Sequence, residues 1–333
     1  MTARENIIPV FVPHLGCPHM CVFCNQRRIS GQTEPATAQT VKNAIENAAA
    51  LTPPGTKRQL AFYGGSFTAI PASAQTELLS AAAPYLADGT LSSIRLSTRP
   101  DAIDGEILDR LEKFGVQTVE LGAQSLDDEV LRLSQRGHTA ADVENASRLI
   151  RSRGFKLILQ MMTGLPGDTD EKSIETAKRI ISLQPDGVRI YPTVIVQNTE
   201  LCDMWRRGEY SEHTVEDAVR VCAVLTELFR EAGIPIIRMG LNPTDELSNG
   251  SVVAGAYHPA FGQLARSAMM LNRVLPELQN AKKAVISVQK GRVSDMRGQK
   301  NANVEKIKNA YPGLDFEIVE DEKQTELVKT VIF

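Results

Sequence analysis

Three of the chain's five cysteines lie inside one eight-residue stretch near the N-terminus, CPHMCVFC. Thiolates this close together are ligands for soft metal ions and iron–sulfur clusters, and a neighbouring pair of thiols can also do redox chemistry. The other two, Cys202 and Cys222, fall in segments of helical periodicity, where a free cysteine packs as a small hydrophobe. We therefore expect the chemistry to reside in Cys17, Cys21 and Cys24.

Several kinds of site are compatible with three clustered thiols. A structural zinc site needs four ligands, which His14 or His19 would have to complete, because no second C-x-x-C follows downstream. A redox C-x-x-C pair would leave Cys17 without a role. An iron–sulfur cluster held by four cysteines would need the distant Cys202. Three thiolates on a 4Fe–4S cluster leave one iron open, which provides a place for a substrate or cofactor to coordinate.

Length and composition are those of a globular protein with a large core. The 333 residues are 42% hydrophobic and 23% charged, with a net charge of -3, as in soluble proteins. No apolar run is long enough to span a membrane, and the N-terminal MTARENIIPV lacks the apolar core of a secretory signal. We expect a cytoplasmic protein with no membrane partner, in a reducing compartment where clustered cysteines bind metal more often than they form disulfides.

Short apolar, β-branched runs alternate with segments of helical periodicity, which predicts repeated strand–helix units and a parallel sheet. The expected strands are residues 7–13, 58–63, 93–98, 117–122, 155–161 and 187–191. The expected helices between them are residues 40–50, 72–86, 104–114, 140–153 and 171–183. Six units predict an α/β fold, a partial (β/α)6 TIM-like barrel over residues 1–240, with functional groups at the C-terminal strand ends. A barrel that stays open at one side can admit a large substrate.

Local signals place the ends of several helices. Gly115 and Gly154 are expected to end two of them in the left-handed conformation. Ser125 with Asp128, and Thr139 with Asp142, fit a side-chain cap followed three residues later by an acid.

Polar residues and glycines follow the predicted strands. YGGSF follows the second strand, and its glycines would allow close backbone approach to a ligand. Arg99, after the third strand, can pair bidentately with a carboxylate. Gln124 closes the fourth strand, Arg136 precedes a Gly-His-Thr turn, and Gly164 begins a GLPG segment after the fifth strand. An ordinary turn or a solvated loop is the alternative explanation for each of them.

The spacing C-x3-C-x-aromatic-C after a first strand resembles that of the radical S-adenosylmethionine (SAM) enzymes. The resemblance implies that Cys17, Cys21 and Cys24 hold a 4Fe–4S cluster whose open iron binds SAM. It implies reductive cleavage of SAM to methionine and a 5'-deoxyadenosyl radical, which takes a hydrogen atom from the substrate. The SAM contacts that it implies, or that the strand ends suggest, are Phe23, Gly64, Gly65, Ser66, Thr98, Arg99, Gln124, Arg136 and Gly164. Tyr191, on the last strand, would face the substrate or pack inside the barrel.

A longer succession of segments narrows the resemblance. YGGSFTAIP, STRPD, ELGAQSLDDEVL, RGHT, GFKLILQMMTGLPG, PDGVRIYPTVIVQNTEL and MWRRGEY look like the radical SAM half of the Elongator catalytic subunit, over roughly residues 5–240. That resemblance implies modification of the wobble uridine of transfer RNA (tRNA) with acetyl-CoA. Two departures stand out: the first cysteine lies closer to the second than in better-known Elongator sequences, and residues 241–333 are too few for the acetyltransferase domain. The expectation is a bacterial stand-alone relative, with an acyl donor from a separate protein and an electron donor such as a flavodoxin or ferredoxin.

Residues 241–333 are expected to form a small C-terminal α+β domain with an uneven charge. Residues 281–308 carry eight Lys/Arg against two acids, and residues 309–333 carry six acids against two lysines. A positive stripe is typical of a protein that binds a phosphate backbone, and the candidate RNA contacts are Lys290, Arg292, Arg297 and Lys300. The alternative is a solvated surface that pairs with the acidic tail.

On these grounds we interpret the chain as a radical SAM enzyme that acts on tRNA. Two alternatives stay open: the same chemistry on a small metabolite, and a non-enzymatic RNA-binding or scaffold protein with a structural metal site. A chain that does not turn over SAM would favour the scaffold protein. A chain that turns over SAM but does not bind RNA would favour the small metabolite as substrate.

Overall fold

The computed structural model describes residues 5–12, 21–24, 35–241 and 250–333. Cys17, His14 and His19 therefore lie outside the described residues, and the predictions made for them stay predictions. Within the described part of the chain, no helix combines the length and apolarity that crossing a membrane requires.

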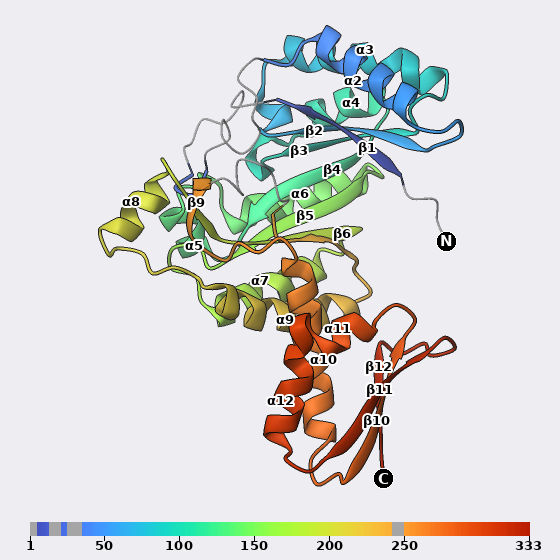
Figure 1. Cartoon of the computed structure of the whole chain (residues 1–333). Helices are drawn as coiled ribbons and strands as arrows, with labels where there is room; N and C mark the ends of the chain where they lie inside the picture. Colours follow the sequence, from blue (N-terminus) through green and yellow to red (C-terminus); the bar gives the residue numbers. More distant parts are fainter. Residues whose placement is uncertain (1–4, 13–20, 25–34, 242–249) are drawn as a thin grey trace.

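A curled parallel sheet of seven strands, in the order β1-β2-β3-β4-β5-β6-β8, forms the larger unit (Figure 1). Its strands are β1 (Asn6–Phe11), β2 (Arg58–Tyr63), β3 (Ser93–Thr98), β4 (Val116–Gln124), β5 (Lys156–Thr163), β6 (Gly187–Pro192) and β8 (Ile236–Met239). The longer helices that connect them are α2 (Ala38–Leu51), α3 (Ala72–Ala87), α4 (Gly105–Lys113), α6 (Ala140–Ser152), α7 (Asp170–Ser182) and α9 (Val215–Glu231). The edge strands β1 and β8 do not pair with each other, so the barrel is open. The expected α/β partial barrel is confirmed.

The sheet has one strand more than the six that the sequence predicted. Helix α9 returns the chain beside β6, where β8 pairs in parallel with Val188 opposite Ile236. Residues 236–239 fall within the range 1–240 predicted for the barrel but not among its six expected strands. Four short elements were not predicted: α5 (Asp128–Leu133), β7 (Val194–Val196), α8 (Glu200–Arg206) and β9 (Val252–Gly255).

Alternation along the strands gives the sheet two different faces. On β4, Val119 and Leu121 are buried in the hydrophobic core under the helices, whereas Glu120 and Gly122 line a cavity on the opposite face. Successive side chains of a strand point to opposite faces. The outer face therefore holds the fold together, and the inner face is available for chemistry.

The helix signals were mostly right. Thr139 and Asp142 form a reciprocal capping box at the start of α6, and Gly115 and Gly154 have φ of 72° and 78°. The expected pairing of Ser125 with Asp128 is wrong. Asp127 caps α5 by accepting from the Val130 amide, because the Ser125 hydroxyl accepts from the Asp127 amide at 3.1 Å.

A smaller C-terminal unit has its own sheet, in which β10 (Lys283–Gln289) lies between β11 (Asp315–Asp321) and β12 (Val328–Ile332). Helices α10 (Phe261–Glu277), α11 (Val293–Arg297) and α12 (Ala302–Ala310) accompany it, so the unit is α+β as expected. Phe261 and Ala265, at the start of α10, belong to the barrel core. Met270 and Val274, further along, belong to the second core. Helix α10 therefore joins the two units (Figure 1).

Candidate active site

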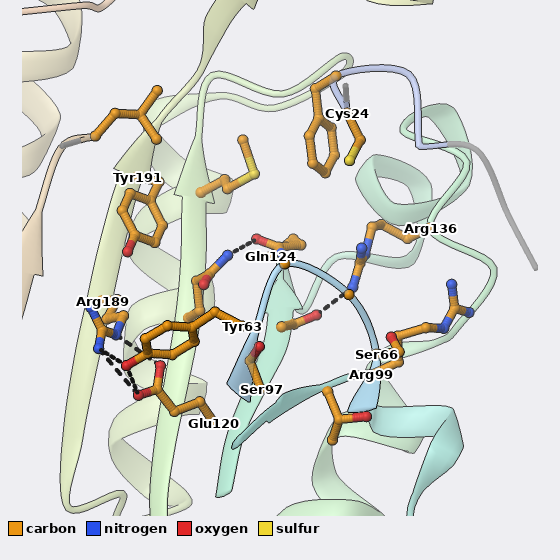
Figure 2. Close-up of a pocket in the computed structure, with 18 of the residues that line it drawn as sticks. Cys24, Tyr63, Ser66, Ser97, Arg99, Glu120, Gln124, Arg136, Arg189 and Tyr191 are labelled. Atoms are coloured by element: carbon orange, nitrogen blue, oxygen red, sulfur yellow. Dashed lines mark hydrogen bonds and ion pairs between the residues drawn. The ribbon is translucent and has the colours of Figure 1, made fainter. Parts of the chain in front are cut away.

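One cavity of about 430 Å³ lies between the inner face of the sheet and the short segment that contains Cys24 (Figure 2). Its lining includes the predicted residues Phe23, Cys24, Gly64, Gly65, Ser66, Thr98, Arg99, Gln124, Arg136 and Tyr191. These come from the cysteine turn, from β2, β3, β4 and β6 or the loops that follow them, and from the loop after α5. The fold thus brings together residues that were chosen one strand at a time.

The two described cysteines of the triplet lie in one tight turn. The Cys24 amide donates to the Cys21 carbonyl at 3.0 Å, and the turn is tied to α5 and α8 through Val22, whose amide donates to Ser134 and whose carbonyl accepts from Leu201. Cys21 is buried, and Cys24 lines the cavity. The described residues alone contain no group of three metal ligands. A cluster at this place would need a ligand beyond them, such as Cys17.

Arg136 connects the cysteine turn to the sheet. Its Nη1 donates to the Cys21 sulfur at 3.3 Å, and its Nη2 donates to the Gly122 carbonyl at 2.7 Å. A Cβ on Gly122 would lie 3.3 Å from that Nη2 and 3.0 Å from the Gln124 amide nitrogen. The sequence analysis missed Gly122, although a glycine inside a strand pattern is a signal of close approach.

Two residues at strand ends have left-handed backbones. Gly64, after β2, has φ of 94°, and a Cβ there would lie 3.2 Å from the Phe11 ring. Gln124 has φ of 65°, which costs a residue with a side chain about 1–2 kcal/mol. Its side-chain oxygen accepts from Gln160 at 3.3 Å. Strain of this kind clusters at functional sites, where the surrounding structure holds it in place.

Arg99 is buried, and its fork has a partner within its own loop. Its Nε and Nη2 donate to the two carboxylate oxygens of Asp101 at 2.9 and 2.7 Å. Burial opposes the ionisation of Asp101, but the hydrogen bonds and the charge of Arg99, together with smaller contributions, hold the pKa of that carboxyl below its ordinary value. The bidentate partner in this structure is thus Asp101, and a SAM contact of Arg99 stays a prediction. Thr98, beside it, shares a 2.5 Å hydrogen bond with Thr68.

An ionic group that the sequence analysis missed occupies the inner face of the sheet (Figure 2). Glu120 accepts from Arg95 at 2.7 Å and pairs with the Nε of Arg189 at 2.9 Å. The Tyr63 hydroxyl donates to Glu120 at 3.2 Å and accepts from Arg189 at 3.1 Å. Burial, and then the Glu120 charge, raise the pKa of Tyr63 to about 12, so the phenol is neutral at physiological pH. The available signal was a charged residue alternating with apolar ones in each strand.

Gly164 does not line the cavity. Its amide donates to Asp168 at 2.8 Å, its carbonyl accepts from the Tyr210 hydroxyl at 2.5 Å, and a Cβ on it would collide with the His213 ring at 2.3 Å. These contacts explain a glycine at this position by packing. Its expected approach to adenine stays a prediction.

The four candidate RNA contacts lie in the C-terminal unit and differ in their surroundings. Lys290 forms an ion pair with Glu322, and Arg292 pairs with Asp295 at 3.0 Å. Arg297 ends α11, and Lys300 lies in the following short helical turn. Cys202 and Cys222 are fully buried, in agreement with the packing role expected for them.

Comparison with known proteins agrees with this geometry. The family model of the radical SAM superfamily matches residues 11–180, and that of the radical SAM C-terminal domain matches residues 185–271. The chain belongs to the radical SAM superfamily. Membership implies SAM and an iron–sulfur cluster as cofactors. The resemblance to Elongator is confirmed by two relatives of known family.

A tRNA uridine(34) acetyltransferase of Methanocaldococcus jannaschii is 28% identical to this radical SAM chain, over 65% of the chain and 47% of the relative. Human Elongator complex protein 3 is 32% identical over 40% of this chain and 25% of its own length. The chain thus spans less than half the length of these relatives. The solved structure of archaeal Methanocaldococcus infernus Elp3 is 23% identical, covers 82% of this chain and 64% of its own, and has a TM-score of 0.65, which supports the fold.

The residues present fit the implied cofactors. Cys24 lines the cavity, and the sulfur of the buried Cys21 in the same turn accepts from Arg136, as expected of a thiolate that ligates a cluster. Glycines after β2 leave backbone groups accessible to a ligand at the cavity wall. No described acidic cluster offers a competing site for a hard metal ion.

Proposed function

We propose that the chain binds a 4Fe–4S cluster through Cys17, Cys21 and Cys24, cleaves SAM reductively, and acts on tRNA. The observation that carries the proposal is the meeting of the cysteine turn, the Gly64–Gly65 pair and Gln124 around one cavity. When bound, the cluster and SAM supply a 5'-deoxyadenosyl radical for hydrogen abstraction, a chemistry that belongs to the cofactors.

The chain's own residues would bind, orient and shield the cofactors. The backbone of Gly64 and Gly65 would face the amino acid part of SAM, and the Gln124 amide is held in orientation by Gln160. Phe11, Phe23 and Met162 supply apolar wall to the same cavity. Such a wall limits the access of water to reactive intermediates.

The tRNA part of the proposal is supported by the relatives, whose names refer to tRNA uridine 34 and to Elongator. It is supported on the chain itself by the basic residues of the C-terminal unit, among them Arg297 and Lys300. An electron donor of the flavodoxin or ferredoxin type, and a separate protein that supplies the acyl group, complete the proposed set of partners.

Anaerobic reconstitution with iron and sulfide tests the proposal directly. The reconstituted chain is incubated with SAM, dithionite and total tRNA, followed by assay of 5'-deoxyadenosine and by mass spectrometry of the tRNA nucleosides. We expect 5'-deoxyadenosine and an altered uridine, neither of which forms with a variant in which Cys17, Cys21 and Cys24 are all alanine.

Two outcomes would contradict parts of the proposal. An iron-loaded chain that releases no 5'-deoxyadenosine is not a radical SAM enzyme in the reductive sense. SAM cleavage that leaves every tRNA nucleoside unchanged would instead indicate a small metabolite as substrate.

A further inference from the structure

The inner face of the sheet carries two arginines on neighbouring strands. Arg189 on β6 and Arg238 on β8 are direct partners in the parallel register. Both line the cavity, and so does Tyr191, two residues beyond Arg189 on the same strand (Figure 2). The two guanidinium groups are therefore presented to the same enclosed space.

Protein carboxylates neutralise only part of this charge. Glu120 is shared, because it pairs with Arg95 at 2.7 Å as well as with Arg189 at 2.9 Å. Its side chain is only 4% exposed, so water does little to screen the group. One negative charge thus faces two guanidinium groups before Arg238 is counted.

Arg238 adds a further positive charge without an acid beside it. Its Nε donates to the Gly240 carbonyl at 3.0 Å, and within the described ranges no carboxylate forms an ion pair with it. Burial is the main cause that lowers the pKa of Arg238; Tyr191 opposes it, and the neighbouring Arg189 adds a smaller lowering effect. Two like charges held together in half-buried positions are unfavourable unless an anion joins them.

The remaining cavity arginines are already occupied. Arg99 is held by both oxygens of Asp101, and Arg136 bonds the Cys21 sulfur and the Gly122 carbonyl. The uncompensated charge is consequently localised at Arg189 and Arg238. It amounts to about one and a half elementary charges once the charge of Glu120 is divided between its two partners.

We propose that Arg189, Arg238 and the Tyr191 hydroxyl form a subsite for a phosphate group of the substrate. Guanidinium forks match phosphate oxygens in geometry, and the negative charge of a phosphate would offset the positive charge of the two arginines. The Tyr191 hydroxyl makes no hydrogen bond within the described residues and is available as a donor. As a substrate subsite this assignment rests on the proposed function, but binding of phosphate requires neither cluster nor SAM.

The test titrates inorganic phosphate into the full chain, without reconstitution, and follows binding by calorimetry. The chain carries other basic residues, so the comparison is between variants. Arg238→Gln should weaken phosphate binding by about tenfold or more, the loss expected for a hydrogen bond between charged groups. The matched control, Arg148→Gln on the exposed face of α6, should bind phosphate as the wild type does.

Thermal unfolding separates binding from a structural role. In phosphate-free buffer Arg238→Gln should unfold at the wild-type temperature or above it, because the substitution removes a repulsion from Arg189. Adding phosphate should raise the unfolding temperature of the wild type but not that of Arg238→Gln. A variant that is destabilised without phosphate, and stabilised by it as the wild type is, would show that Arg238 only supports the fold.

A titration with acetate tests whether the site prefers phosphate to a carboxylate. Acetate should bind at least tenfold more weakly than phosphate; equal binding, or an unchanged affinity for phosphate in Arg238→Gln, would overturn the assignment. The outcome is distinguishable from failure of the proposed function. Phosphate binding without SAM cleavage leaves the subsite standing, and SAM cleavage without phosphate binding removes only the subsite.

Discussion

Arg136 ties the cysteine turn to the fourth strand with two hydrogen bonds from one guanidinium. Residues that hydrogen-bond to a metal ligand and hold it in place typically contribute about 10- to 100-fold to metal affinity or activity. We therefore predict that Arg136→Met lowers the affinity of the reconstituted chain for iron by about that factor, as measured by competition with a chelator. Arg148→Gln serves as the control. Iron retention at the wild-type level in Arg136→Met would show that the contact with Cys21 at 3.3 Å is incidental.

The strained backbone of Gln124 gives a prediction that depends on one dihedral angle. Gln124→Gly and Gln124→Ala both remove the amide, but only glycine adopts φ of 65° without strain. The glycine variant should be more stable than the alanine variant by about 1 kcal/mol. Glycine avoids the backbone strain, but part of this gain is lost because glycine is more flexible in the unfolded chain. Denaturant titration measures the difference. Equal stability of the two would mean that the loop relaxes when the side chain is removed.

What the sequence could predict at this scale depended on the residue type. Clustered cysteines have few ordinary explanations, and the structure places Cys24 at a cavity that Gly64 and Gly65 also line. Arginine has many. Arg99 is expected to contact SAM, and this stays a prediction; in the structure it pairs with Asp101, two residues along the chain. Glu120 and Arg238 escaped notice because a charge in an alternating strand is usually on the solvent side, whereas here that side is the interior of an open barrel.

At the scale of elements, Asp168 organises the entry to α7. It accepts from the Gly164 amide at 2.8 Å, the Thr169 amide at 3.0 Å and the Ser173 hydroxyl at 2.7 Å. Burial nevertheless outweighs these bonds and raises the pKa of Asp168 from 3.8 to about 6. The folded state therefore binds the proton more tightly than the unfolded state does.

The sign of the pH dependence follows from that shift. Between pH 3.8 and about 6 the folded chain holds more protons at Asp168 than the unfolded chain, so this group's contribution to stability falls as pH rises. Compared with Asp168→Asn, the wild type should lose on the order of 2 kcal/mol of unfolding free energy between about pH 4 and pH 7. Urea titrations of both proteins at the two pH values measure this. A constant difference between them would show that Asp168 titrates normally.

Element types followed from hydrophobic periodicity wherever the element was long. Helix α5 and strands β7 and β9 are too short for a period to be visible, and they were missed. Strand β8 was not among the six expected strands of the barrel, and its place beside β6 depends on the path of α9. The cap of α5 moved from Ser125 to Asp127 because several residues in the sequence SLDD can cap, and only the path of the loop selects one of them.

At the scale of the whole molecule, the barrel and the C-terminal unit are joined through α9 and α10 (Figure 1). Arg273 of α10 forms an ion pair with Glu227 of α9, and Ala223 of α9 belongs to the second hydrophobic core. The sequence predicted both units by alternation and composition. It did not predict that one helix would serve both cores, since this depends on contacts between segments that are far apart in the chain.

The last prediction concerns how the molecule would attract tRNA. The net charge of -3 provides no general attraction to a polyanion, so affinity must come from local charge. Within the C-terminal unit Lys290 and Arg292 already have acidic partners, whereas no ion pair joins Arg297 or Lys300 to any described residue. The second pair of cations should therefore contact phosphates, because they need not give up a protein partner to do so.

The two pairs can be compared as double variants that remove the same charge. Each phosphate contact on a single-stranded nucleic acid contributes about 0.7 to the slope of log affinity against log salt. Replacing Arg297 and Lys300 with glutamine should make the slope shallower by about 1.4, while replacing Lys290 and Arg292 should change it much less. Filter binding over a range of salt concentrations measures both slopes. Equal changes in the two variants would indicate that only the summed charge matters, and no change in either would place the tRNA contact elsewhere on the molecule.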